Sequence, residues 1–370
     1  MGKRMHPRLD ATGVTGVTGV AIFGVAILLV TLTLLVFGCV PAPGTARGET
    51  TGGSDRSRGA ITSATPTVAT AAAPGAEAPV EGAWRAGPEL PTPRSEVAAA
   101  TVDGTIYVVG GLAQDGTTLS IVEALGPDAE AWQPRASLPE PRDHLAAVNL
   151  DGHLYVVAGS PGWFGQQTST TLWRYDAALD AWEERASLPL GRAAHAAAVL
   201  DGKLYVAGGI GPDPEQLLVY DPATDTWSTK APISRPREHL AAATMGGRLY
   251  VVGGRWGGVG NLDLLEEYDP VTDAWHTLPP MPTARGGLAA VALDGKLYVS
   301  GGEALDASRA TFPQLEVFDP DSETWSPAPP APTGRHGLAA ATRAGEVYFL
   351  AGGRLAGLDV SGVVETFTPS

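Results

Sequence analysis

The sequence lacks three things whose absence limits the possible folds and functions: cysteine pairs, helical periodicity and an excess of basic residues. Cys39 is the only cysteine, so disulfide bonds within the chain cannot stabilise it. After residue 83 no long stretch repeats its apolar residues with a helical period, so we expect no helices there. The same region holds 19 basic and 35 acidic residues, a net charge of −16. This charge repels phosphate backbones, so nucleic acid is not an expected partner.

Catalytic and cofactor motifs are also absent. The sequence contains no His-Glu-x-x-His, no Gly-x-Ser-x-Gly, no cysteine pair and no phosphate-binding loop that opens a helix. Its 7 histidines are scattered, with no tight cluster of the kind that binds zinc or copper. We therefore expect neither a cofactor nor a metal ion, and we prefer a binding role to an enzymatic one.

Tryptophan recurs at nearly regular intervals through everything after residue 83. Six of the 9 tryptophans stand at intervals of 48, 50, 45, 48 and 50 residues. Such a period indicates an array in which each unit buries its apolar face against its neighbours. The tryptophans that mark the units are Trp84, Trp132, Trp182, Trp227, Trp275 and Trp325.

Turn and strand signals alternate within each unit, most plainly between Trp182 and Trp227. Asp201-Gly202 separates two runs of strand-forming residues, Gly208-Gly209 ends the second run, and a third run ends at Asp221-Pro222. Asp-Gly favours a tight hairpin, because the reversal needs positive φ angles that Gly, Asn and Asp adopt most easily. Each unit is therefore predicted to be four short strands joined by a turn, a loop and a second turn.

Spacing within the units is stricter than spacing between them. An arginine opens each unit, a glycine follows ten residues later, and a tyrosine comes three residues after the glycine. A pair of small residues then closes the second strand, and all variation in length falls in the loop after this pair or after the tryptophan. The arginines are Arg94, Arg142, Arg192, Arg237, Arg285 and Arg335, and the tyrosines are Tyr107, Tyr155, Tyr205, Tyr250, Tyr298 and Tyr348.

This order of residues resembles the kelch repeat. Arginine, a small-residue strand, Leu-Tyr-Val-x-Gly-Gly, Tyr-Asp-Pro and tryptophan follow one another in six registered copies from residue 84 to the end. Six kelch repeats imply an all-β fold, a six-bladed β-propeller whose blades are four-stranded antiparallel meanders. The departures are small: Leu125-Gly126-Pro127 replaces Tyr-Asp-Pro in the first copy, Ala158 and Ala351 replace a glycine, and Phe318 replaces a tyrosine.

The two ends of the repeat array complement each other. The last copy stops at Pro369-Ser370, before its tryptophan strand, whereas the first copy begins at Trp84 with no strands ahead of it. We therefore expect the Trp84 strand to complete the C-terminal blade and close a monomeric ring. An unpaired edge strand favours aggregation, and pairing the two ends of the domain removes it.

The first 38 residues have the composition of a membrane-targeting segment. Three basic residues precede an uncharged run from Gly19 to Gly38, and about 20 apolar residues suffice for a membrane span. Basic residues ahead of such a run hold the N-terminus in the cytoplasm, which puts the rest of the chain outside. Residues 1–38 are thus predicted to be a signal peptide or signal anchor, with the protein at the outer face of the cell membrane.

Cys39 directly follows this run and offers a second route to the membrane. Val36-Phe37-Gly38-Cys39 resembles a bacterial lipobox, although Phe37 is atypical. Lipid attachment to Cys39 and an uncleaved anchor both remain open. Residues 39–83 are rich in Pro, Gly, Ala, Ser and Thr and have no apolar periodicity, so we predict a disordered tether ahead of a propeller at 84–370.

We expect ligands on the face that carries the variable loops. Up-and-down blades place their short turns on the opposite face, and rigid scaffolds present adaptable residues on loops. The loop aromatics Trp163 and Trp256 would stack on sugar rings or grip a peptide, or else fold back over the blades. Arg255 and Glu303, each directly after a Gly-Gly pair, are further candidates.

The six repeat arginines enter the same face, at the start of the innermost strand. One interpretation is a guanidinium ring that captures carboxylates at the channel mouth. The other, which we favour because the residue recurs in every repeat, is structural pairing with carboxylates or carbonyl groups. Residues beside the arginines that differ between repeats are candidates for ligand binding or acid-base chemistry, or form a solvated rim; they are Glu96, Asp143, His144, Glu238, His239 and His336.

Three functions fit these residues. The first is a recognition module that binds a protein or glycan at the cell surface. The second is an acid-base enzyme that resembles six-bladed kelch sialic-acid mutarotases, which need proton transfer and an arginine for the substrate carboxylate. The third is a structural envelope protein. Copper oxidases that resemble galactose oxidase are disfavoured, because they need a cysteine-modified tyrosine and Cys39 precedes the domain.

Overall fold

The computed structural model describes residues 78–162, 167–305 and 308–370. The predicted anchor, Cys39, Trp163 and the tether up to residue 77 lie outside these residues. Within the described part of the chain, no helix is long and apolar enough to cross a membrane.

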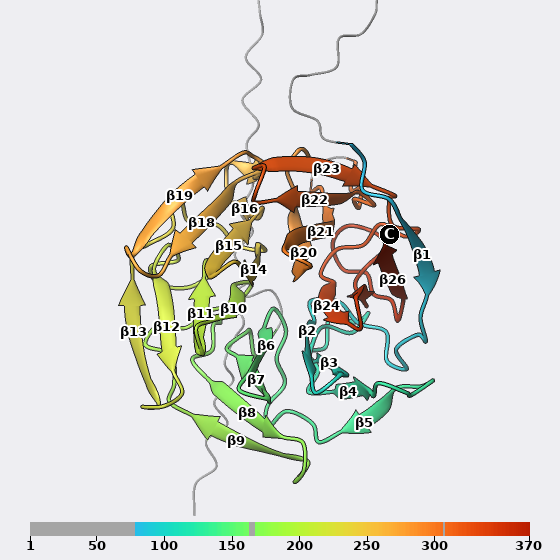
Figure 1. The fold of residues 1–370 in the computed structure, drawn as a ribbon. Helices are drawn as coiled ribbons and strands as arrows, with labels where there is room; N and C mark the ends of the chain where they lie inside the picture. The colour runs from blue at the N-terminus through green and yellow to red at the C-terminus, as the bar shows by residue number, and fades with distance from the viewer. Residues whose placement is uncertain (1–77, 163–166, 306–307) are drawn as a thin grey trace, which may run out of the picture. The chain divides into compact units, whose positions relative to one another are not determined.

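Six four-stranded antiparallel sheets surround a central axis, so the all-β, six-bladed propeller predicted from the repeats is confirmed (Figure 1). Within five of the blades the spatial order of the strands follows their order in the chain, with the first strand innermost. The tight turns have the expected chemistry: Asp201 and Gly202, between the first two strands of blade 3, have φ angles of 50° and 68°. Two successive positive φ angles match the twist of the flanking strands.

The strands of each blade are short and similar in length. Blade 1 contains β2 (Ala98–Val102), β3 (Thr105–Val109), β4 (Val122–Leu125) and β5 (Gln133–Arg135). Blade 2 contains β6 (Ala146–Leu150), β7 (His153–Val157), β8 (Leu172–Asp176) and β9 (Ala181–Arg185). Blade 3 contains β10 (Ala196–Leu200), β11 (Lys203–Ala207), β12 (Leu217–Asp221) and β13 (Thr226–Lys230). Blade 4 contains β14 (Ala241–Met245), β15 (Arg248–Val252), β18 (Leu265–Asp269) and β19 (Ala274–Leu278). Blade 5 contains β20 (Gly286–Leu293), β21 (Lys296–Glu303), β22 (Leu315–Asp319) and β23 (Thr324–Ala328). Blade 6 contains β24 (Ala339–Arg343), β25 (Glu346–Leu350), β26 (Val364–Pro369) and β1 (Gly82–Ala86).

The N-terminal strand closes the ring, as the unequal ends of the repeat array predict. β1 pairs antiparallel with β26, with Trp84 opposite Phe367. The strand begins at Gly82, two residues before the boundary expected from the tryptophan. The indole of Trp84 also packs on Phe349 and Phe367, with ring centroids 5.6 and 5.3 Å apart. Blade 6 is therefore assembled from both ends of the domain.

The repeated tryptophans connect neighbouring blades. Each indole Nε1 donates a hydrogen bond of 2.7 to 2.9 Å to a backbone carbonyl oxygen that lies four residues after the preceding tryptophan. Trp132, for example, donates to Pro88, and Trp182 donates to Ala136. Buried indole N–H groups need such a partner. The outer strand of every blade is thus tied to the blade before it.

The apolar core lies between blades rather than within any one sheet. In five of the six blades the tyrosine of the second strand packs on an aromatic ring from the third strand of the next blade, as Tyr107 does on Tyr175 at 5.7 Å and Tyr205 on Tyr268 at 6.0 Å. In the fifth copy Phe318 provides the receiving ring, at 6.4 Å from Tyr250. Because each interface joins two blades, the stability of one blade depends on its neighbours.

The small-residue pair after each second strand permits a close backbone approach. Gly111 has a φ of 107°, and a Cβ there would lie 2.5 Å from the carbonyl oxygen of Ser95, so only glycine fits. The first position of the pair is less demanding, with φ of 48° at Ala158 and 59° at Ala351. An alanine can adopt this left-handed region at a modest cost, which explains the two departures from Gly-Gly.

Candidate functional site

Small side chains line the central channel. An alanine stands five residues after each repeat arginine, and these alanines border a channel cavity of about 440 Å³: Ala99, Ala147, Ala197, Ala242, Ala290 and Ala340. Toward the face with the variable loops, the next layer consists of five apolar residues and one histidine: Val97, Leu145, His195, Leu240, Leu288 and Leu338. Between this layer and the face with the variable loops lies the channel mouth.

A ring of backbone hydrogen bonds surrounds the channel mouth. It is formed by the second residue after each repeat arginine, whose amide donates to the carbonyl oxygen of the equivalent residue in the preceding blade at 2.8 to 3.1 Å. The circle closes where the amide of Val97 donates to Gly337 at 3.4 Å. All members have φ between 50° and 74°. We call this set the mouth ring: Glu96, His144, Ala194, His239, Gly287 and Gly337.

The repeat arginines lie inside the blades and not at the channel mouth. None of the six is more than 3% exposed. In four blades the guanidinium pairs with a buried glutamate of the third strand, as Arg237 does with Glu266 at 2.5 Å and Arg285 with Glu316 at 2.8 Å. Arg94 and Arg335 make the equivalent pairs with Glu123 and Glu365. The structure therefore places these guanidinium groups where a structural role is expected, out of reach of a ligand in the channel.

The two remaining arginines show what replaces the glutamate. In blade 2 the third strand has Trp173 at this position, and the guanidinium carbon of Arg142 lies 5.0 Å from the indole centroid. In blade 3 it has Leu218, and Arg192 donates to the backbone carbonyl oxygens of Pro212 and Asp213 instead. A buried guanidinium requires hydrogen-bond acceptors, and Arg142 finds them in Glu140 and the carbonyl oxygen of Pro141.

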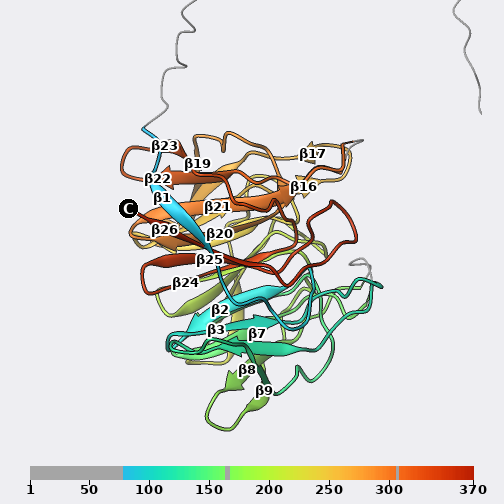
Figure 2. The same cartoon turned by 90° about the vertical axis from the view of Figure 1, so that its right-hand side faces the viewer.

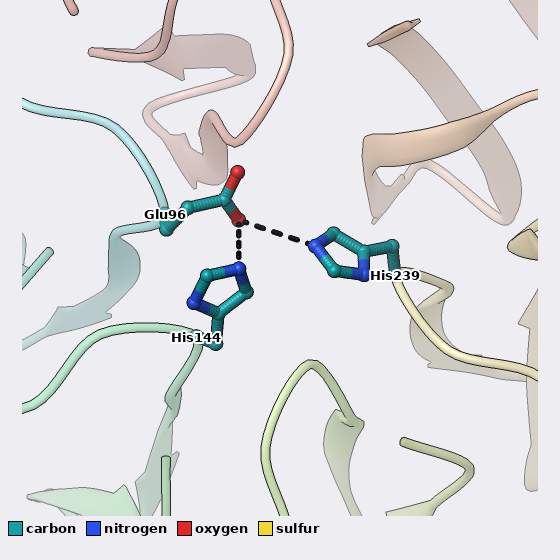
Figure 3. A group of neighbouring side chains, drawn as sticks. All are labelled: Glu96, His144 and His239. Carbon is teal, nitrogen blue, oxygen red and sulfur yellow. Dashed lines mark ion pairs between the residues drawn. The ribbon is translucent and has the colours of Figure 1, made fainter. Parts of the chain in front are cut away.

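Residues that break the repeat converge at the channel mouth. Glu96, His144 and His239 come from blades 1, 2 and 4 and point toward one another (Figure 3). Oε2 of Glu96 lies 3.5 Å from Nε2 of His144 and 3.8 Å from Nε2 of His239. The two imidazole rings meet edge to face, with centroids 5.0 Å apart.

The carboxylate that precedes each of these histidines in the chain lies against Nδ1 of its ring. Oδ1 of Asp143 lies 2.6 Å from Nδ1 of His144, and Glu238 contacts Nδ1 of His239. The other oxygen of Asp143 accepts a hydrogen bond of 2.6 Å from Thr118. Nδ1 of His144 donates to Asp143, and Nε2 of His239 accepts from Arg255. In the neutral form of each ring the lone pair is therefore on Nε2, which faces Glu96.

Arg255 joins these residues to blade 5, and His336 brings in blade 6. Its Nε lies 2.9 Å from Glu238, its Nη1 lies 2.5 Å from Glu303, and its Nη2 lies 3.1 Å from Nε2 of His239. Nε2 of His336 lies 3.7 Å from Glu303 and 4.0 Å from Glu96. We call the whole set the mouth cluster: Glu96, Asp143, His144, Glu238, His239, Arg255, Glu303 and His336.

Burial and charge act in opposite directions on the two central histidines. Burial lowers the pKa of His144, but the carboxylates of Glu96 and Asp143 outweigh it, so its pKa is raised above the ordinary value. Burial and the positive charge of Arg255 hold the pKa of His239 well below its usual range. The cluster contains four carboxyl groups and one guanidinium, so it favours positively charged or uncharged ligands over anions.

Two adjoining cavities give access to the mouth cluster. One, of about 220 Å³, is bordered by Glu96, His144, His239, Glu303 and His336 among others. The second, of about 490 Å³, shares Arg255 and Leu305 with it and is also lined by Glu238, Trp256 and Asn261. β16 (Arg255–Trp256) and β17 (Gly260–Asn261) form a small hairpin that carries this wall (Figure 2). The larger volume lies within the range of roughly 300 to 1,000 Å³ usual for ligand sites.

The structure thus brings together all eight non-repeating polar candidates and places Trp256 beside them. Trp163 and Cys39 lie outside the described residues. The scattered histidines gave no sign of a cluster, because residues in different blades meet only when the ring closes. The mouth ring and His195 were also missed, although their fixed distance from the repeat arginines is a usable signal. The prediction that no metal ion binds rested on the spacing of the histidines along the sequence, which does not reveal this convergence.

Comparisons with known proteins agree with this architecture. The family model described as the KLHDC2/KLHL20/DRC7 Kelch-repeats domain matches residues 52–254 and 194–364. A solved structure entitled "Structure of YjhT" resembles the chain with a TM-score of 0.65 at 21% sequence identity, over 76% of this chain and 97% of that one. We found no match among curated protein sequences. The fold, the registered repeats and the family match together show that this chain belongs to the kelch-repeat family.

Proposed function

We propose that this propeller is a binding module whose ligand, an uncharged carbohydrate group, enters the channel mouth. Kelch propellers generally serve as interaction modules. The observation that carries the proposal is the mouth cluster, in which residues that break an otherwise regular repeat converge beside a cavity of about 490 Å³. A structural role alone does not account for so many buried and partly buried polar groups that differ between repeats and converge at one place.

The lining of the larger cavity suits a sugar. Trp256 is partly buried beside Arg255 and offers an aromatic surface on which a sugar ring can stack. Glu238 supplies acceptors for sugar hydroxyl groups, and Asn261 adds an amide. Arg255 is already shared between two carboxylates. Its charge is therefore compensated, which favours neutral sugars over sugar acids.

We place this activity outside the cell. The support is the sequence of residues 1–38, whose basic start and uncharged run are typical of an exported or anchored protein. In this account the segment, or a lipid on Cys39, attaches the chain to the membrane while residues 39–83 carry the propeller away from it.

A glycan array probed with the full chain tests the proposal. We expect binding to a restricted set of neutral glycans, loss of at least tenfold in affinity for Trp256→Ala, and partial retention for Trp256→Phe. His153→Ala, at the start of β7 on the opposite face, serves as the matched control. Binding that survives Trp256→Ala, or capture of proteins with no glycan bound, would refute the carbohydrate proposal.

Acid-base catalysis is the second candidate. Arg255 pairs with Glu238, which lines the larger cavity, and with Glu303, which lines the smaller one, and Arg255 itself lines both. A ligand where the two cavities adjoin therefore meets carboxylates and a guanidinium together. This arrangement suits proton transfer at a sugar ring. If the bound sugar exchanges its anomers faster with the protein than without it, as followed by NMR, and Glu303→Gln abolishes the acceleration, the protein is an enzyme of this mutarotase-like kind.

A further inference from the structure

We propose that Glu96, His144 and His239 bind a divalent transition-metal ion of the zinc class at the channel mouth. Their donor atoms all lie within 4.8 Å of one another (Figure 3). In a tetrahedral zinc site with bonds of about 2.1 Å, donor atoms stand roughly 3.4 Å apart. The separations of 3.5 and 3.8 Å between Glu96 and the two histidines match this value closely.

The carboxylates behind the histidines are the second observation. Metal-binding histidines usually donate the N–H that faces away from the ion to a carboxylate or carbonyl group, which fixes the ring and strengthens the ligand. Asp143 does this for His144. The carboxylate of Glu238 lies against Nδ1 of His239 without a hydrogen bond between them, and Arg255 donates to Nε2 of that ring. Asp143 is itself fully buried and held by Thr118. Both Nε2 atoms consequently face Glu96.

The donor set selects the class of ion. Two imidazoles and one carboxylate suit zinc and neighbouring transition metals, whereas magnesium and calcium prefer oxygen donors throughout. Three protein ligands leave a position for water or a ligand hydroxyl group. The cavity of about 220 Å³ borders all three residues and gives access to that position. A doubly charged ion also offsets part of the surplus of carboxylates in the mouth cluster.

The backbone holds the three ligands in place. All three belong to the mouth ring, where hydrogen bonds between blades fix their positions, and all three have φ between 50° and 53°. Glycine adopts this region without strain, and it stands at the same place in blades 5 and 6. A site built on rigid elements binds without reorganisation of its backbone.

Arg255 is the group that an ion must displace. Its Nη2 donates to Nε2 of His239 over 3.1 Å, while its other nitrogens bond to Glu238 and Glu303. Coordination of His239 replaces one hydrogen bond and leaves Arg255 its two carboxylate partners. Binding of the ion therefore removes only one of the contacts that Arg255 makes.

Calorimetric titration of the untagged full chain with zinc chloride, after removal of metals with a chelator, tests the proposal. We expect one zinc ion per chain. Affinity should fall at least tenfold in Glu96→Gly, His144→Gly and His239→Gly, which copy the residue found at Gly287 and Gly337. Asp143→Asn should weaken binding by about 10- to 100-fold, as loss of an outer partner usually does. His153→Ala, which removes a histidine from the opposite face, should bind as the unaltered chain does.

A second measurement, on the unaltered chain, tests the proposal even if the variants fail to fold. Cobalt(II) added to the unaltered chain should give visible absorption bands of a nitrogen and oxygen donor set, and zinc should abolish them. Absence of zinc binding to the unaltered chain, or binding that survives all three glycine substitutions, would overturn the proposal. Because the titration contains no sugar, its outcome is independent of the carbohydrate function.

Discussion

The indole Nε1 of Trp84 donates a 2.7 Å hydrogen bond to the carbonyl oxygen of Pro329, 245 residues further along the chain. The same bond links every other pair of neighbouring blades, but here it joins the two ends of the domain. β1 and β26 add five paired residues to this closure. The ring is closed by the same contacts that hold its blades together.

Removal of residues 82–86 should therefore destabilise the whole propeller. The deletion exposes the edge of β26 together with the rings of Phe349 and Phe367, so we expect a large fall in melting temperature and aggregation. Trp84→Phe, which keeps an aromatic ring but loses the hydrogen bond, should cost only about 1 kcal/mol. Urea unfolding measures both. A deletion variant that melts with the unaltered chain would exclude this mode of closure.

The buried arginines should differ in their contribution to stability. Arg237→Ala leaves the buried carboxylate of Glu266 without its partner, which we expect to cost about 3 to 5 kcal/mol of unfolding free energy. Among the described residues Arg192 bonds only to carbonyl oxygens and pairs with no buried carboxylate of the third strand, so Arg192→Ala should cost clearly less. Chemical denaturation of the two variants gives the comparison. Equal losses would show that the Arg237–Glu266 pair is not what sets the cost.

His195 should make the fold sensitive to mild acid. Burial, and next to it the charge of Arg192, lowers its pKa to about 3. Within the described residues, neither of its ring nitrogens has a hydrogen-bond partner. The unfolded chain binds a proton near the ordinary histidine pKa of about 6.5 and the folded chain does not. This histidine's contribution is therefore undiminished above pH 6.5 and declines as the pH falls from there toward 3.

His195→Leu, which copies the residue at 145, 240, 288 and 338, removes that loss. We expect the variant to be more stable at neutral pH by about 1 to 3 kcal/mol, because an unpartnered buried polar group is gone. Its stability should also fall less steeply than that of the unaltered chain between pH 6.5 and 4. Melting temperatures across this range provide the measurement, and parallel curves would contradict the account.

Gly337 should be sensitive to substitution in a way that Gly287 is not. A Cβ at Gly337 would lie 2.4 Å from Oε1 of Glu96, whereas at Gly287 its nearest contact is 3.5 Å away, at His336. Both positions have left-handed φ, which Ala194 tolerates in the same ring. Gly337→Ala should displace the Glu96 carboxylate and weaken zinc binding several-fold, while Gly287→Ala leaves it intact. Calorimetric titration of both variants with zinc tests this. Equal affinities would show that Glu96 is not a ligand of the ion.

Much of the fold could be predicted from the sequence, because every unit of the array shows the same pattern of residues. The spacing of arginine, tyrosine and tryptophan recurs in six copies, and the unequal ends predict the pairing of β1 with β26. Pairing of the arginines with carboxylates or carbonyl groups was predicted, but not which glutamates would take part. Glu266 follows Arg237 by 29 residues and Glu316 follows Arg285 by 31, since loops of unequal length lie between them and blur the register.

The site could be predicted in part. His144 and His239 were selected because they differ from their counterparts in other repeats, and that difference marked the mouth cluster. Their convergence on Glu96 could not be predicted, because it depends on the rotation between blades and on side-chain direction. The proposed metal site depends on Nε2 of both rings facing one carboxylate, which the sequence alone does not show.

The most direct test of the central claim, that the channel mouth is the functional site, is ligand binding by a chain whose mouth ring has lost its polar side chains. The triple variant Glu96→Gly, His144→Gly and His239→Gly gives all three positions the residue that the chain itself uses at 287 and 337. We predict a melting temperature close to that of the unaltered chain and loss of both zinc and glycan binding. A folded triple variant that still binds both would contradict the account.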